Sequence, residues 1–180
     1  MAVPLREMFP NELAAFRSYS ICDYANDLMS AHSMNQQAAL AQAGQEFDEL
    51  LPGSFLRVIE YDGHAAGVLW YLTEETDGIQ HAFLNDLIIS PEYRRKGCAS
   101  AALAALAKEA RQHGCTEIRL YVSDDNDAAK ALYQRCGYRL LRPFKGVLIC
   151  TGKSSDETPV PYRRFLIATS RPWCYNEYKR

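Results

Sequence analysis

The sequence predicts a mixed α/β fold, in which an antiparallel meander continues into a βαβ unit with helices on both faces of one mixed sheet. Two turn signals, Asp62-Gly63 and Asp77-Gly78, separate strand-like runs and predict the meander. From residue 99 onward, helical and strand-like patterns alternate. A strand, a helix and a second strand in succession predict a parallel crossover.

The first ninety residues predict two helices before the meander. Pro10 opens a stretch with apolar side chains at three-to-four spacing, which is typical of a helix packed on a core. Pro52-Gly53 ends a second helical stretch, rich in alanine and glutamine. The predicted helices span 10–28 and 35–51, and the predicted strands span 55–61, 65–72 and 81–89.

The second half predicts two more helices. Leu103, Leu106 and Ala110 share one helical face, and Gly114 is a natural C-terminal stop. Polar residues at 123–126 supply N-cap chemistry for a helix that ends at Arg135 or Cys136. The predicted helices span 99–113 and 127–136, and the predicted strands span 118–122, 138–142 and 147–150.

The length and composition bound the class of protein. A chain of 180 residues with 48 % apolar and 23 % charged residues is typical of one globular domain. We expect this domain to span residues 1–150. Residues 151–180 begin with a loop composition and end in a basic, aromatic tail, so we expect an extension that packs on the domain or forms a homodimer contact.

The N-terminus lacks the apolar region of a secretory signal, and no apolar run is long enough to span a bilayer. We therefore expect a cytoplasmic protein with no membrane partner. Its cysteines show no metal-ligand spacing, which predicts free thiols and no bound metal. They are Cys22, Cys98, Cys115, Cys136, Cys150 and Cys174.

The net charge of −2 conceals an asymmetry between the two halves. Residues 1–90 carry a balance of −10, whereas residues 91–180 carry +8. Two interpretations stay open: the halves meet oppositely charged partners, or they attract each other across one domain. The acidic first half and a pI of about 6.1 argue against a nucleic-acid partner.

One segment carries a chemical signal. After the predicted strand ending at Ile89, a loop holds Arg94, Arg95 and Lys96 before Gly97, and a helix follows at once. Glycine permits close approach of a ligand to the backbone, and a helix N-terminus attracts phosphate oxygens. The loop alone also suits an ordinary basic turn.

Two motifs together resemble a known family. Arg94-x-x-Gly97-x-Ala99 resembles the (Gln/Arg)-x-x-Gly-x-(Gly/Ala) signature of the GNAT superfamily of acetyltransferases. The segment 126–138 resembles its second signature, Asn-x-x-Ala-x-x-Leu-Tyr-x-x-x-Gly-(Phe/Tyr), with Asn126, Tyr133 and Tyr138 in place. The resemblance covers residues 55–142 well. It implies the GNAT-type acyl-CoA N-acyltransferase fold, with acetyl-CoA as acetyl donor and a primary amine as acceptor.

The resemblance also implies how acetyl-CoA is held. Backbone groups of the strand end would pair with the pantetheine arm, and amides of the loop would cradle the pyrophosphate, with Arg94 or Lys96 adding charge-assisted contacts. Asn126 would bond the cofactor arm, an assignment compatible with a plain N-cap. The implied cofactor-binding residues are Leu87, Ile88, Ile89, Arg94, Arg95, Lys96, Gly97, Cys98, Ala99, Ser100, Asn126 and Tyr133.

For catalysis, the resemblance makes Tyr133 the general acid that protonates the departing thiolate, the alternative being a core tyrosine. Tyr138 is expected in the core. Asp86 on the central strand is a candidate base for the amine, the alternative being a structural carboxyl. Glu74 and Glu75 are other candidates, and two histidines, His64 and His81, are weaker ones.

The acidic first half suits an acceptor that is cationic before it reacts, either a small amine or a protein amine. One other class of function stays open, a catalytically silent acyl-CoA-binding module with a role in regulation or assembly. Retention of Tyr133 favours the enzyme.

Overall fold

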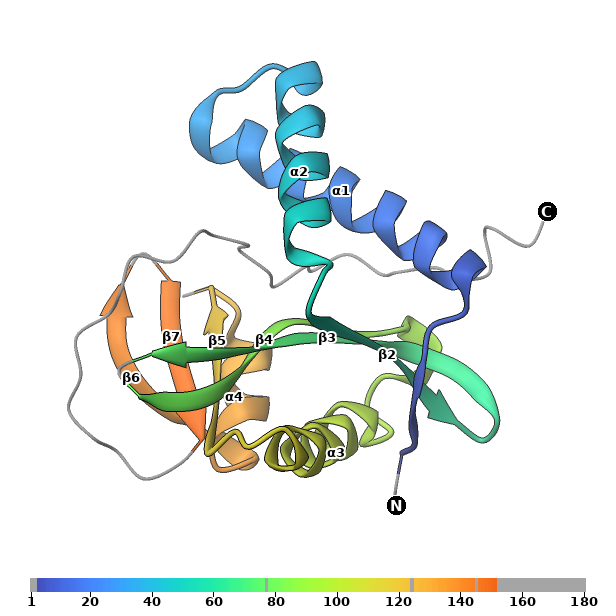
Figure 1. Cartoon of the computed structure of the whole chain (residues 1–180), viewed down its shortest axis with the longest axis vertical. Helices are drawn as coiled ribbons and strands as arrows, with labels where there is room; N and C mark the ends of the chain where they lie inside the picture. The colour runs from blue at the N-terminus through green and yellow to red at the C-terminus, as the bar shows by residue number, and fades with distance from the viewer. Residues whose placement is uncertain (1–2, 77, 124, 145, 152–180) are drawn as a thin grey trace.

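The computed structural model describes residues 3–76, 78–123, 125–144 and 146–151 (Figure 1). The helices are α1 (Pro10–His32), α2 (Gln36–Leu50), α3 (Cys98–Gln112) and α4 (Asp127–Arg135), with a short 3-10 helix η1 (Pro91–Tyr93). The strands are β1 (Leu5–Glu7), β2 (Ser54–Tyr61), β3 (His64–Thr76), β4 (Ile79–Ile89), β5 (Glu117–Val122), β6 (Arg139–Phe144) and β7 (Gly146–Thr151). Apart from Thr151, the predicted extension 151–180 lies outside the described residues.

Among the described residues, the strands form one mixed sheet in the order β1-β2-β3-β4-β5-β7-β6. Strands β2, β3 and β4 are the predicted antiparallel meander. Strand β4 pairs in parallel with β5 after the crossover through α3, which confirms the βαβ unit. Strand β7 lies between β5 and β6 and runs antiparallel to both, so the strands on either side of α4 are not neighbours.

The predicted elements differ from the observed ones mainly at their ends. Helix α1 continues to His32 and β3 to Thr76, beyond the predicted ends at 28 and 72. Strand β1 was not predicted. It has three residues and is defined by its pairing with β2, Arg6 lying opposite Val58, so no local pattern of its own marks it.

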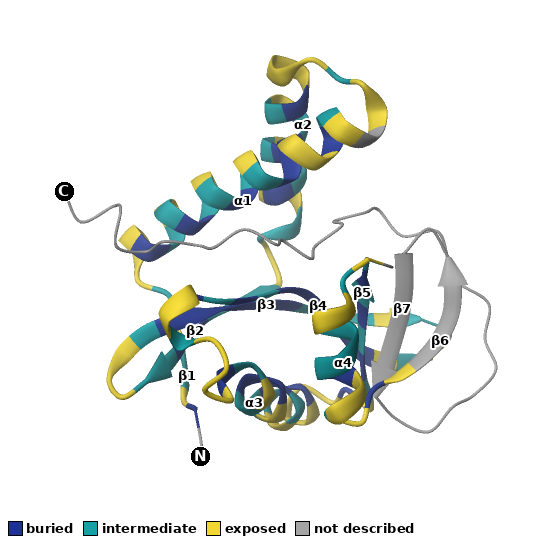
Figure 2. Ribbon diagram, turned by 180° about the vertical axis from the view of Figure 1, so that it is seen from behind, coloured by how far each residue is buried: buried dark blue, intermediate teal, exposed yellow. Residues whose placement is uncertain are grey.

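Helices cover both faces of the sheet, as predicted (Figures 1 and 2). On one face, α1 and α2 contribute Phe16 and Phe47, whose rings pack against Trp70 of β3 with centroids 5.9 and 5.0 Å away. On the other face, α3 and α4 cover the largest apolar cluster, built on Leu69, Tyr71, Ala82, Leu84, Leu103, Leu106, Ile118, Leu120, Val122, Tyr133 and Tyr138.

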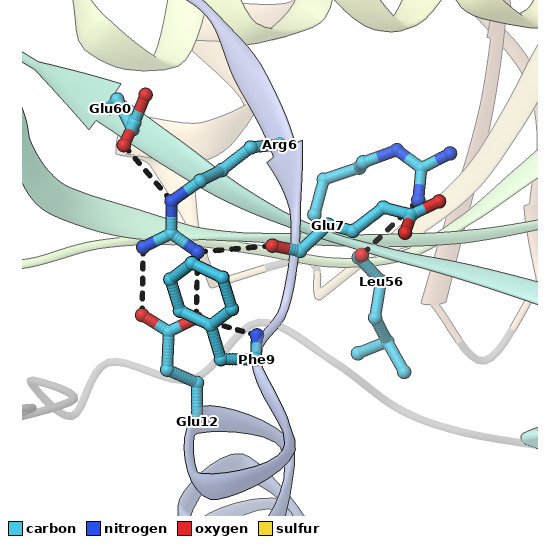
Figure 3. Close-up of polar contacts among 7 residues, drawn as sticks. Arg6, Glu7, Phe9, Glu12, Leu56 and Glu60 are labelled. Carbon is cyan, nitrogen blue, oxygen red and sulfur yellow. Dashed lines mark hydrogen bonds and ion pairs between the residues drawn. The ribbon is translucent and has the colours of Figure 1, made fainter.

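An ion-pair network anchors the start of α1 to the sheet (Figure 3). Arg6 of β1 donates to both carboxylate oxygens of Glu12 in α1, at 2.7 and 2.8 Å, and to Glu60 of β2 at 2.9 Å. The Glu12 carboxylate, only 2 % exposed, also accepts from the backbone N–H of Phe9. A buried carboxylate with this many partners holds β1, α1 and β2 in one arrangement.

The central strands separate at one place. Strand β4 pairs with β5 only from His81 to Leu84, whereas β4 itself runs on to Ile89. At the same place the pairing of β3 with β4 shifts: Tyr71 lies opposite Leu84 and Trp70 opposite Asp86, leaving Asn85 as the extra residue of a β-bulge. Beyond the bulge, β4 has a paired strand on its β3 side alone within the described chain.

Gly67 of β3 lets β3 approach this free part of β4. A Cβ atom built on Gly67 would lie 2.1 Å from the carbonyl oxygen of Ile88, a contact that no side chain can make. Since the obstructing atom belongs to the backbone, any larger residue would push the end of β4 aside.

We predict that Gly67→Ala lowers the free energy of unfolding by about 1–3 kcal/mol, the usual range for overpacking a core. Gly44→Ala is the matched control: its Cβ would lie 3.8 Å from Cδ1 of Ile21, an ordinary contact, and alanine favours a helix by about 1 kcal/mol. Urea unfolding of both variants gives the comparison, and equal stability of Gly67→Ala and wild type would contradict the close approach.

Candidate active site

Beyond Leu84, one edge of β4 has no neighbouring strand within the residues that the structure describes. Leu87, Ile88 and Ile89 pair with Leu69, Val68 and Gly67 of β3 on one side, and on the other side they lie beyond the last β4–β5 pair. An extended ligand with amide groups can add to such an edge as a strand does. The carbonyl oxygen of Ile89 already accepts a hydrogen bond from Nε of Arg94, at 3.0 Å.

The loop after β4 ends at the N-terminus of α3. Gly97 is the N-cap and has φ +83°, a left-handed conformation that suits glycine. The first hydrogen bond into this helix runs from the N–H of Ala101 to the carbonyl of Gly97. The N–H groups of residues 98–100 precede it, and such groups at a helix start attract anions.

The basic side chains of this loop make contacts within the protein. Arg94 donates to Ile89, as described above. The Lys96 ammonium lies 5.5 Å from the ring centroid of Tyr61, on β2, and 5.3 Å from that of Tyr93, on η1. These cation–π contacts tie the loop to the β2–β3 hairpin. The two tyrosines were not singled out in the sequence, since only the fold brings Tyr61 next to this loop.

Asn126 lies at the N-cap of α4, and its side chain accepts from the N–H of Ala129 at 3.0 Å. The N-cap interpretation is therefore confirmed, while its contact with a cofactor stays a prediction. Tyr138 lies in the core at 5 % exposure, as expected.

Tyr133 projects from α4 into the core and is 8 % exposed. Its ring centroid lies 5.5 Å from that of Tyr138. Burial raises the pKa of the Tyr133 hydroxyl well above its usual value, and the charges of Asp86 and Cys136 add to the effect. Tyr133 therefore holds its proton at neutral pH, as a general acid must before it acts.

Asp86 lies on the opposite face of the sheet, the one that α1 and α2 cover. It pairs across strands with Trp70, and Ile88, two residues along the same face, packs in the Phe16 cluster. The Asp86 carboxyl is 4 % exposed, and within the described residues its Oδ1 atom has no hydrogen-bond partner. Burial raises its pKa well above the usual value, and the charge of Asp23 on α1 adds to the elevation.

Unlike Asp86, the other candidate bases are either in contact with each other or exposed to solvent. Glu74 contacts the buried His81, with 3.2 Å between Oε2 and Nε2, so these two side chains are engaged with each other. Glu75 is exposed and lies on the far side of β3 from Glu74. His64 is exposed at the start of β3. Asp86 is thus the candidate that lies buried beside the separation of β4 and β5 and is electrostatically coupled to Tyr133.

In the described part of the chain, no three histidine, cysteine, aspartate or glutamate side chains gather as metal ligands would. No helix within the same residues has the length and apolar character needed to cross a bilayer.

Comparison with known proteins identifies the class that this fold and site define. Residues 18–138 match the acetyltransferase (GNAT) family. This chain therefore belongs to the GNAT acetyltransferases, which confirms the resemblance seen in its two signatures.

Two relatives from Bacillus subtilis (strain 168) match most of the chain. The uncharacterized N-acetyltransferase YdgE is 26 % identical over 147 residues, covering 78 % of this chain and 94 % of the relative. The uncharacterized N-acetyltransferase YycN is 30 % identical over 148 residues, covering 77 % and 94 %. The crystal structure of YycN superimposes with a TM-score of 0.67, covering 93 % of this chain and all of YycN.

A more distant neighbour shows the same fold with a ligand. The PaiA N-acetyltransferase of Thermoplasma acidophilum, crystallised in complex with coenzyme A, has a TM-score of 0.57 at 16 % identity and covers 85 % of this chain and all of its own.

We predict that Gly97→Glu abolishes acetyl-CoA binding, because it places an anion where the phosphates approach. Gly114→Glu is the matched control. Gly114 has φ +80° and open space around its Cβ position, as Gly97 does, but lies past the other end of α3. Both variants should lose about 1–2 kcal/mol of stability through left-handed strain. Calorimetric titration should show binding lost in the first alone; unchanged affinity would overturn the phosphate assignment.

Proposed function

We propose that this protein transfers an acetyl group from acetyl-CoA to a primary amine by direct attack, with Tyr133 as the general acid and Asp86 as the base. The observation that carries the proposal is the separation of β4 from β5, with a buried carboxyl and a buried hydroxyl on opposite faces of the sheet beside it. Proton acceptor and proton donor thus flank one gap from its two sides.

In this proposal, the pantetheine arm of acetyl-CoA adds to the free edge of β4 at residues 87–89. Its pyrophosphate lies against the N–H groups of residues 95–100, at the positive end of the α3 dipole. Arg94 and Lys96 hold the loop in shape through Ile89 and the two tyrosines, which leaves the backbone amides as the main phosphate ligands. The coenzyme A complex of PaiA supports binding of this ligand by the fold.

The reaction needs two proton transfers. Asp86, directly or through a water molecule, takes a proton from the acceptor ammonium, which leaves a neutral amine. The amine nitrogen then attacks the thioester carbonyl carbon, and a backbone N–H near Leu87 or Ile88 stabilises the developing oxyanion. As the C–N bond forms and the C–S bond breaks, Tyr133 donates its proton to the leaving thiolate.

The acceptor class follows from charge. An amine is cationic before it reacts, and the face of the sheet that α1 and α2 cover carries the buried carboxyl of Asp86. The thialysine N-ε-acetyltransferase of Bos taurus, 33 % identical over 78 residues that cover 43 % of this chain and 46 % of that protein, is named for a side-chain amine. We propose a cytoplasmic enzyme acting on a small cationic amine or a protein amine. Release of free coenzyme A thiol across a panel of such amines tests this proposal.

Tyr133→Phe should keep acetyl-CoA affinity and lower kcat by about 10²-fold or more, the usual range for removing a general acid. Tyr138→Phe is the matched control, since it removes a hydroxyl from the adjacent ring in the same core. Steady-state kinetics with thiol detection and calorimetric titration measure both effects. Full turnover in Tyr133→Phe would overturn its assignment, and a wild-type protein that binds acetyl-CoA but acetylates no amine would favour the silent binding module.

Asp86→Asn should lower kcat by about 10²-fold and yet stabilise the protein at neutral pH. The pKa of Asp86 is higher in the folded protein than in the unfolded chain, where it is about 3.9. The stability that Asp86 contributes is therefore fully present below about pH 3.9, and it is lost as the pH rises toward the folded-state pKa. Asparagine does not ionise, so the stability of Asp86→Asn relative to wild type should increase from pH 4 upward. Urea unfolding across this range measures it. A variant less stable than wild type at every pH would instead indicate a structural hydrogen-bonding role.

A further inference from the structure

Asn85 occupies the point at which β4 leaves β5. The last pair between these two strands joins Leu84 to Leu120, one residue before Asn85. On the other side of β4, the register of β3 passes directly from Leu84 to Asp86. Among the described strands, Asn85 therefore has no cross-strand partner in either direction. A bulge of this kind interrupts regular pairing and redirects a side chain, and bulges are frequent beside active sites.

Asn85 and Asp86 carry complementary polar atoms that are not bonded to each other. The two residues are 6 % and 4 % exposed. Nδ2 of Asn85 is a donor and Oδ1 of Asp86 is an acceptor, yet within the described residues neither atom has a hydrogen-bond partner. Burying a polar atom without a partner is unfavourable and uncommon in native proteins, and a catalytic role is one reason to keep such an atom.

In the proposed function, acetyl-CoA brings its thioester to this point. The pyrophosphate lies at residues 95–100, and the pantetheine arm runs back along β4 past residues 89–87. The acetyl end would therefore lie toward residue 85, where the gap between β4 and β5 closes. The two reacting groups match the two open atoms: the thioester oxygen accepts hydrogen bonds, as Asn85 requires, and the acceptor ammonium donates one, as Asp86 requires.

Resting on the proposed function, we infer that Asn85 is a catalytic residue whose Nδ2 donates a hydrogen bond to the thioester carbonyl oxygen. The amide can turn about its Cβ–Cγ bond, because the rotation of such a bond is broad and roughly two-fold, so the donor can reach an oxygen in the gap. Attack by the amine makes this oxygen negative, and a positioned donor in a site that excludes water stabilises that charge strongly. Asn85 transfers no proton: it acts beside the backbone N–H near Leu87 or Ile88, and Tyr133 remains the acid.

Kinetics test this inference with the most active amine of the panel. Asn85→Leu removes the amide and leaves a side chain of similar shape. It should lower kcat by about 10²–10³-fold, the range for one oxyanion donor, and leave the affinity for coenzyme A unchanged, since coenzyme A has no acetyl oxygen. Thr73→Val is the matched control, because it removes a hydroxyl from β3 at the pair with Ala82, outside the gap, and should keep kcat. If Asn85→Leu does not fold, Asn85→Ala replaces it with the same kinetic expectation.

A second measurement does not depend on turnover. A hydrogen bond weakens the C=O bond of the thioester, so infrared difference spectra of acetyl-CoA labelled with carbon-13 at this carbonyl should show a lower stretching frequency in wild type than in the Asn85 variant. A merely structural role would leave the frequency unchanged.

Equal frequencies in the two complexes, or wild-type kcat in the folded Asn85 variant, would overturn this inference alone. A wild type that binds acetyl-CoA but acetylates no amine overturns the proposed function, and the infrared comparison still decides whether Asn85 contacts the thioester. A wild type that does not bind acetyl-CoA overturns both.

Discussion

The separation of β4 from β5 beyond Leu84 is the constraint on which the rest of the site depends. Strands β4 and β5 pair in parallel as far as Leu84. The bulge at Asn85 follows, and beyond it β4 stays paired with β3 along its other edge. Because backbone groups on the free edge lie beyond the last β5 pair, the sheet offers an extended ligand the hydrogen bonds that a neighbouring strand would otherwise take. The loop and α3 follow directly, so the N–H groups at the start of α3, the proposed phosphate ligands, lie at the end of the same edge.

The buried polar groups of the site lower the stability of the folded protein, and contacts elsewhere in the fold offset this loss. Burial of the Asp86 carboxyl, whose Oδ1 atom has no hydrogen-bond partner among the described residues, disfavours the folded state. The Arg6–Glu12–Glu60 network and the aromatic cluster of Phe16, Phe47 and Trp70 lie on the same face of the sheet and fix α1 against it. Helix α1 is thus held by contacts that take no part in the proposed chemistry.

The buried positions of the site divide between the two faces of the sheet. Tyr133 comes from α4 on one face and Asp86 points to the face covered by α1, and the charge of Asp86 adds to the elevation of the Tyr133 pKa. The two GNAT signatures lie at the start of α3 and along α4, on the face of the sheet that holds Tyr133.

The sequence by itself determined helices α1–α4, strands β2–β7, the meander, the crossover and the glycine-containing loop before α3, because hairpin turns, helix stops and the two signatures are local patterns of a few residues. Only the tertiary structure decided the bulge at Asn85, the contact of Lys96 with Tyr61 and the burial of Asp86. Those features join residues far apart in the chain, and their energies arise from burial and from the pairing of whole strands. A local sequence pattern predicts neither the burial nor the strand pairing. From the sequence, Asp86 was therefore one candidate base among several, and the fold distinguishes it by burying it beside the gap between β4 and β5.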